Sequence, residues 1–92
     1  MLFAEREYEL EGTDHKLVLQ IEEPHMEDGN WVCEHRLIGL DPDYAETSKS
    51  FGVDKLQALT SALFRISVDL ECLSQDSDQQ VTWLGDSRLG LL

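Results

Sequence analysis

The chain has 92 residues, the usual size of one folded domain, and is too short for two separate hydrophobic cores. Its residues are 41% hydrophobic and 28% charged, as in folded soluble proteins, and no segment reaches the roughly 18 apolar residues of a membrane span. Nineteen acidic residues against seven basic ones give a net charge of −12, which argues against binding to nucleic acids or anionic membranes. We therefore expect one domain over residues 1–92.

The amino terminus and the cysteines indicate a reducing compartment. Residues 1–10 contain an acidic residue at position 5 and lack the basic start and apolar run of an export signal. Cys33 and Cys72 lie 39 positions apart, without the close pairing of a zinc or redox motif. We expect a cytoplasmic protein whose two cysteines are free thiols that fill the interior.

Alternating hydrophobicity predicts a hairpin at the start of the chain. One side of residues 2–11 is predicted to face the core and carries Leu2, Ala4, Tyr8 and Leu10. Arg6 is the polar exception on this side. The opposite, water-exposed side carries four acids, Glu5, Glu7, Glu9 and Glu11. Residues 12–14 favour a turn, and residues 16–22 alternate again, with Leu17, Leu19 and Ile21 inward.

A third strand is predicted to begin at Trp31, after an irregular stretch at residues 23–30. One of its sides carries Trp31, Cys33, His35 and Leu37. The sequence Asp41-Pro42-Asp43 suits a type I turn. Residues 44–50 are predicted to form a short, polar fourth strand at a sheet edge, where Lys49 discourages pairing with another chain.

A change of period at residue 53 predicts an amphipathic helix over residues 53–73. Its apolar positions recur at spacings of three and four, namely Leu56, Leu59, Ala62, Leu63, Ile66, Leu70 and Leu73. Asp54 and Gln57 resemble a capping box at its start, with Ser50 as a competing cap. Residues 74–80 are predicted as a loop and residues 81–85 as a short last strand. The expected fold is therefore α+β, an antiparallel meander of three to four strands covered on one face by one long helix, with a short carboxy-terminal strand.

Two apolar residues of the predicted helix, Phe64 and Val68, lie outside its leucine stripe. They should not face the sheet. Either the apolar carboxy-terminal tail covers them, or they mark a contact with another protein or a dimer interface.

Cys33 and His35 are the clearest candidates for a chemical site, because their side chains share one side of a strand. A cysteine–histidine enzyme also needs a group that orients the histidine and an oxyanion site, and neither is recognisable in the sequence. We interpret both residues as part of the core, with His35 near its rim. His15, His25 and His35 match no zinc spacing, and residues 22–31 lack the register of a calcium loop. No catalytic residue, metal site or cofactor is predicted.

Three motifs resemble a family of small bacterial domains of unknown function. The family pattern has a Trp-x-Cys strand, a Gly-x-Asp-x-x-Gln-Ala-Leu helix start and a Trp-Leu pair near the end. Here the resemblance spans residues 31–85, while the amino-terminal hairpin agrees only in its pattern of alternation. The residues that carry the resemblance are Trp31, Cys33, Gly39, Gly52, Asp54, Gln57, Ala58, Leu59, Trp83 and Leu84. The resemblance implies a small stand-alone domain and brings no catalytic or ligand role.

Small size, acidity and the lack of a recognisable site favour a non-enzymatic interaction protein, and an immunity protein that neutralises a basic toxin is one form that fits. A basic protein partner would be attracted and steered by the negative charge. The residues expected to bind it are Glu5, Glu7, Glu9, Glu11, Glu22, Glu23, Glu27 and Asp28. The alternative is a self-associating, homodimeric domain without a ligand, with a contact that includes Phe64 and Val68.

Overall fold

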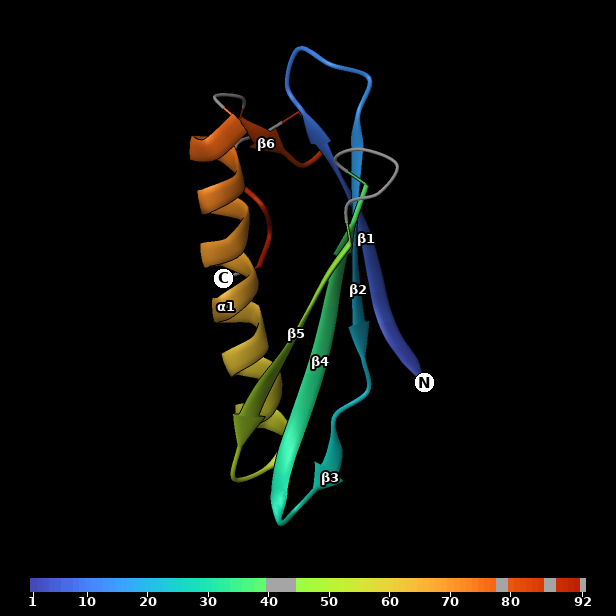
Figure 1. Ribbon diagram of the computed structural model, residues 1–92, viewed down its shortest axis with the longest axis vertical. Helices are drawn as coiled ribbons and strands as arrows, with labels where there is room; N and C mark the ends of the chain where they lie inside the picture. Colours follow the sequence, from blue (N-terminus) through green and yellow to red (C-terminus); the bar gives the residue numbers. More distant parts are fainter. Residues whose placement is uncertain (40–44, 78–79, 86–87, 92) are drawn as a thin grey trace.

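The chain folds into an antiparallel sheet with a long helix across one face, which confirms the predicted α+β architecture (Figure 1). The computed structural model describes residues 1–39, 45–77, 80–85 and 88–91. In chain order the elements are β1 (Leu2–Leu10), β2 (Lys16–Glu22), β3 (His25–Glu27), β4 (Asn30–Ile38), β5 (Ala45–Gly52), α1 (Lys55–Ser77) and β6 (Val81–Thr82). The turn predicted at residues 41–43 lies outside the described residues.

Strands β1, β2, β4 and β5 form the predicted meander, in which each strand pairs with its antiparallel neighbour. β5 pairs along one edge of β4, while β2 and β3 share the other edge. β6 pairs with the end of β1. The fourth strand predicted at residues 44–50 is therefore confirmed as β5, and the predicted short carboxy-terminal strand is β6. Among the described residues, β3 is the strand of the sheet that was not predicted.

The short strand β3 lies within residues 23–30, where an irregular stretch was predicted, so that prediction was wrong. β3 joins β4 through a two-residue turn at Asp28 and Gly29, whose φ angles are +50° and +84°. A turn of two left-handed residues matches the right-handed twist of the flanking strands, and Asp-Gly is a favoured sequence for it. The Asp-Gly pair was the sequence signal for this hairpin.

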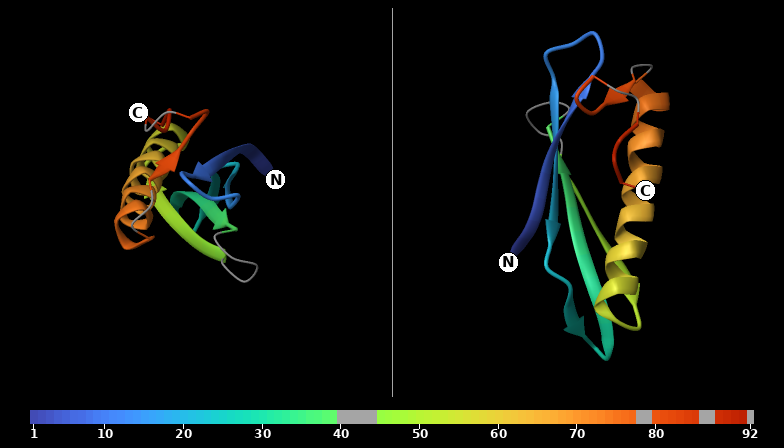
Figure 2. Two further views of the ribbon diagram at one scale, coloured as in Figure 1. Left: turned by 90° about the horizontal axis from the view of Figure 1, so that it is seen from above. Right: turned by 180° about the vertical axis from the view of Figure 1, so that it is seen from behind.

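The hydrophobic core lies between the sheet and α1, which is over β4 and β5 (Figure 1). From the helix, the fully buried residues recur every fourth position, at Ala58, Ala62, Ile66 and Leu70. From the sheet, the core includes Tyr8, Leu17, Leu19, Cys33 and Leu37. The carboxy-terminal segment adds Trp83, Leu89 and Leu91, and it lies beside the helix on the inner face of the sheet (Figure 2).

The start of α1 has the predicted capping box. The Asp54 carboxylate accepts a hydrogen bond from the backbone amide of Gln57 at 2.7 Å, and the Gln57 side chain accepts one from the amide of Val53 at 2.7 Å. These bonds satisfy amides that have no partner within the helix. Asp54, and not Ser50, is therefore the cap. The helix continues to Ser77, beyond the predicted end at residue 73.

Several side chains that were predicted to be buried are exposed. Leu56 is 72% exposed, because it lies roughly 200° around the helix from Ala58 and so points away from the sheet. Leu2 is 48% exposed and Ala4 is also exposed, since α1 does not extend over the start of β1 and the β1–β2 register shifts between these two residues. Cys72 is an exposed thiol on the helix, whereas Cys33 is buried.

Candidate functional site

Cys33 and His35 lie on the inner face of β4, as the packing interpretation predicts. Cys33 is fully buried, and its thiol donates a hydrogen bond to the Glu22 carbonyl at a sulfur–oxygen distance of 3.6 Å. Burial raises the pKa of the Cys33 thiol, and so disfavours the thiolate that a nucleophile requires. His35 is only 2% exposed, which places it inside the core rather than near its rim.

His35 has an acidic partner that the sequence did not reveal. Its Nε2 atom lies 3.4 Å from Oδ2 of Asp69 on α1, and Arg65 donates to the other oxygen of Asp69 at 3.1 Å. The Nδ1 atom of His35 is buried without a hydrogen-bond partner among the described residues. Burial is the main cause that lowers the pKa of His35, although Asp69 acts in the opposite direction. His35 is therefore a neutral group that links β4 to α1.

The other two histidines lie apart from His35. His15 is exposed beside the β1–β2 turn, and His25 on β3 is 3.2 Å from the Glu27 carboxylate. Among the described residues no group of three or more histidine, cysteine, aspartate or glutamate side chains is arranged to hold a metal ion.

An acidic stripe follows the long axis of the molecule. We define it as the eight acids predicted to bind a partner, Glu5, Glu7, Glu9, Glu11, Glu22, Glu23, Glu27 and Asp28. The β1–β2 register places Leu2, at the start of β1, opposite Glu22, at the end of β2. The acids of β1 are therefore followed along the sheet by Glu22 and Glu23, and then by Glu27 and Asp28 at the end of β3. The molecule is 44 Å long, and the turns beside Glu11 and Asp28 lie at its opposite ends (Figure 1).

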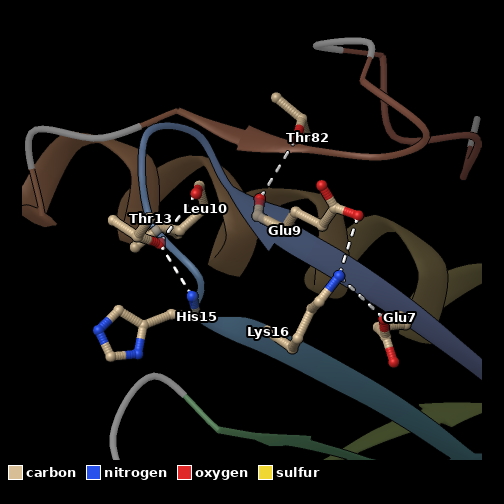
Figure 3. A network of polar contacts seen from close by, with 7 residues as sticks. All are labelled: Glu7, Glu9, Leu10, Thr13, His15, Lys16 and Thr82. Atoms are coloured by element: carbon tan, nitrogen blue, oxygen red, sulfur yellow. Dashed lines mark hydrogen bonds and ion pairs between the residues drawn. The ribbon is translucent and has the colours of Figure 1, made fainter.

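Cations neutralise only part of this stripe. The Lys16 ammonium lies 3.4 Å from the Glu7 carboxylate and 3.1 Å from that of Glu9 (Figure 3). These carboxylates, Glu9 first, raise the pKa of Lys16. Lys49 lies 3.0 Å from Glu27 and lowers the pKa of that carboxyl, and the amino terminus pairs with Glu22 at 3.2 Å.

The remaining acids of the stripe have no cationic partner among the described residues. Glu5 accepts a hydrogen bond from the neutral Gln20 amide at 2.8 Å. Glu11, Glu23 and Asp28 are exposed and form no ion pair within the described part of the chain. The stripe is therefore a surface of net negative charge that faces solvent.

An apolar groove lies on the inner side of β1, close to the stripe. It has a volume of about 220 Å³ and is lined mainly by Phe3, Ala4, Leu19, Ile21, Leu59 and Leu63, with Leu91 beside them. The Arg6 guanidinium lies 3.9 Å from the centre of the Trp83 ring and donates to the carbonyls of Leu89 and Gly90 at 3.1 and 3.0 Å. These contacts hold the carboxy-terminal segment at one end of the groove. The groove was not predicted from the sequence, because the tail and the edge of the helix form it together.

Phe64 and Val68 lie on the outer side of α1, as predicted from their position outside the stripe of core residues. Phe64 is 62% exposed and Val68 is 40% exposed. The apolar tail residues Trp83, Leu89 and Leu91 pack against the core, and Phe64 stays mostly exposed.

Comparison with known proteins identifies the family. A family model described as a domain of unknown function, DUF6968, matches residues 4–92. The chain belongs to this family. A domain of unknown function is what the resemblance implied, and the matched residues include most of the amino-terminal hairpin. The bacterial origin and the motif residues of that resemblance stay predictions.

One catalogued enzyme shares a short stretch with the chain. A tRNA (guanine(37)-N(1))-methyltransferase from Danio rerio is 49% identical over 43 aligned residues, and the match covers 44% of the chain and 9% of the enzyme. The chain therefore spans less than a tenth of the length of that relative. No solved structure matches the chain. In the described residues, α1 is not apolar enough to span a membrane, and no other helix is present.

Proposed function

We propose that the protein is a non-enzymatic interaction module that binds a basic protein partner through the acidic stripe. The supporting observation is the stripe itself: eight carboxylates lie on β1, β2 and β3 or directly after these strands. Among the described residues their basic partners are two lysines, the amino terminus and His25. A surface of one sign attracts a partner of opposite sign and accelerates the encounter. We place this binding in the cytoplasm.

The specific form that we propose is an immunity protein that covers the cationic surface of a bacterial toxin. Such an inhibitor needs a charged, solvent-exposed surface and no reaction of its own, and the acidic stripe supplies that surface. A toxin gene adjacent to the gene for this protein would support this form. A captured partner with no toxic activity would contradict it, while leaving the interaction module in place.

RNA is not part of this proposal, although one relative is a tRNA methyltransferase. Nucleic-acid binding depends on lysine and arginine side chains that release counterions from phosphates. A net charge of −12 opposes that process.

The experiment compares two double variants that change the net charge equally. Glu5→Lys with Glu7→Lys reverses the middle of the stripe, whereas Asp14→Lys with Glu71→Lys reverses exposed acids outside it. Each protein is immobilised and exposed to lysate of the producing cells at low and moderate salt, after its folded state has been checked by thermal unfolding. We expect the first variant to lose a cationic partner that the wild type and the second variant retain, with association slowed about tenfold or more at low salt. Equal capture by both variants would refute the assignment.

A self-associating domain is the second candidate, and the exposure of Phe64 and Val68 favours it. Neighbouring exposed apolar side chains on one helix face can form a two-fold contact. Sedimentation at micromolar concentration separates the candidates. A salt-insensitive dimer that Phe64→Asp dissociates would support self-association, and a monomer would favour the interaction module.

A further inference from the structure

β1 has an open edge over most of its length. One edge of β1 pairs with β2 from Leu2 to Glu9, whereas the other pairs with β6 only at Glu9 and Leu10. In the part of the chain that the structure describes, no strand pairs with the second edge from Leu2 to Tyr8. Open edges of this kind are templates on which another extended chain can form backbone hydrogen bonds.

The direction of the backbone groups along this edge follows from the bonds at its end. Leu10 donates its amide to the carbonyl of His15, on the β2 side, and Glu11 donates its amide to Gln80, on the β6 side. Backbone groups alternate along a strand, so the amides and carbonyls of Glu5 and Glu7 point to the open edge. The side chains of the same two residues belong to the acidic stripe.

The surroundings of the open edge define the chemistry of a matching strand. A strand paired here would place alternate side chains beside the Glu5 and Glu7 carboxylates, and the others toward the apolar groove next to Ala4. The groove volume of about 220 Å³ is below the roughly 300 to 1,000 Å³ of small-molecule pockets, and it suits individual side chains better than a whole ligand. The matching segment therefore alternates basic and apolar residues.

A second copy of this chain does not fit the same edge. In a two-fold pairing of β1 with β1 of a second copy, outer-face side chains of one copy lie next to outer-face side chains of the other. Glu5 and Glu7 would therefore lie next to glutamates of the second copy. Like charges directly opposite each other destabilise a strand pair. β5, another edge strand, is also a poor match for a basic segment, because its outer face carries Lys49 and α1 packs against it.

We propose that a partner binds by strand addition, in which an extended segment of alternating basic and apolar residues pairs with the open edge of β1 at Leu2–Tyr8. This inference rests on the proposed function, since the same acidic stripe attracts the partner. In this mode of binding, the backbone amides and carbonyls of Glu5 and Glu7 form hydrogen bonds with the partner, in addition to the attraction by their carboxylates.

The test uses a capped six-residue peptide, Lys-Val-Lys-Leu-Lys-Val, with two matched variants of the protein. Glu7→Gln removes the carboxylate and keeps the backbone amide, whereas Glu7→Pro removes both. Proline is tolerated on an edge strand where the lost amide faces solvent, so the β1–β2 pairing should survive and can be checked by circular dichroism and thermal unfolding. We expect Glu7→Gln to weaken peptide binding by about two- to fivefold and Glu7→Pro by about tenfold more.

A second probe avoids any change to the protein. The same peptide with N-methyl groups on alternate residues keeps its charge and its apolar side chains but cannot pair along one edge. We expect at least one of the two N-methylation patterns to abolish binding to the wild type. If both N-methylated peptides bind as tightly as the parent peptide, strand addition is wrong. In that case, the proposed function would still hold if peptide binding weakens with added salt and in the Glu5→Lys and Glu7→Lys variants. If binding is unchanged by salt and by these substitutions, both the strand addition and the proposed function are wrong.

Discussion

His35 on β4 and Asp69 on α1 meet inside the core, with Nε2 and Oδ2 separated by 3.4 Å. This contact joins the sheet to the helix by a polar interaction beside a mainly apolar core. Two more charges act on the pKa of His35: Arg65 of α1 lowers it, and Glu46 of β5 raises it. The net effect is a lowered pKa, because burial outweighs the acidic neighbours.

The lowered pKa of His35 predicts a loss of stability in mild acid. The unfolded chain takes up a proton near the ordinary value of 6.5, whereas the folded chain does so only at lower pH. The contribution of His35 to the free energy of unfolding should therefore be constant well above pH 6.5 and decrease as the pH falls through 6.5 toward the lower pKa of the folded state. Urea unfolding between pH 7.5 and 5.5 measures this decrease. A His35→Phe variant should lack the His35 part of the slope and His15→Gln should retain it; equal slopes in His35→Phe and the wild type would contradict the prediction.

The buried side of α1 predicts unequal costs for two similar substitutions. Ile66 is fully buried and Leu56 is 72% exposed, although both belong to the apolar repeat of the sequence. Ile66→Ala should lower the free energy of unfolding by about 2 to 5 kcal/mol, because it leaves a cavity. Leu56→Ala should change it by less than about 0.5 kcal/mol. Chemical denaturation of both variants checks the difference, and similar losses would mean that the helix is rotated from the orientation described.

The capping box predicts a local cost at the start of α1. Asp54→Ala removes the acceptor for the Gln57 amide and should cost about 1 kcal/mol of stability. Thr60→Ala, one turn into the helix, is the control, because alanine has the higher helix propensity and no cap is lost. A Thr60→Ala variant less stable than Asp54→Ala in thermal unfolding would argue against this helix start.

The two cysteines should differ in reactivity. Cys72 is exposed on α1, whereas Cys33 is fully buried and burial raises the pKa of its thiol. An aromatic disulfide reagent should therefore modify one thiol per folded molecule quickly and the second only after unfolding. Cys72→Ser should remove the fast phase. A fast phase that persists in this variant would show that Cys33 is accessible.

Much of the fold was predictable because β1, β2, β4 and α1 are long enough to show their periods. The alternation of Leu17, Leu19 and Ile21 locates the inner face of β2 directly, and all three are buried. β3 is only three residues long, so it has no measurable period, and its Asp-Gly turn was the one available signal. The sequence did not show which side of the helix is most deeply buried, because Ala58 and Ala62 are at the centre of the buried face and larger leucines lie on either side of it.

The candidate site was predictable only in part. The exposed acids of β1 follow from alternation, and the structure places Glu5, Glu7 and Glu9 on the exposed side of the strand, with Glu11 exposed just beyond its end. The contact between His35 and Asp69 joins residues 34 positions apart on different elements, which no local pattern can show. The groove beside Ala4 depends equally on the tail and on the edge of the helix, and the open edge of β1 depends on the shortness of β6.

Amide hydrogen exchange of β1 tests the central claim most directly. The backbone amides of Glu5 and Glu7 should exchange quickly in the free protein and become protected when the peptide Lys-Val-Lys-Leu-Lys-Val is added, because they then donate to its carbonyls. Amides of β5, another edge strand, should show no change and act as the internal reference. Protection at β5 or on α1 around Phe64, with Glu5 and Glu7 unchanged, would contradict the account and place recognition elsewhere on the molecule.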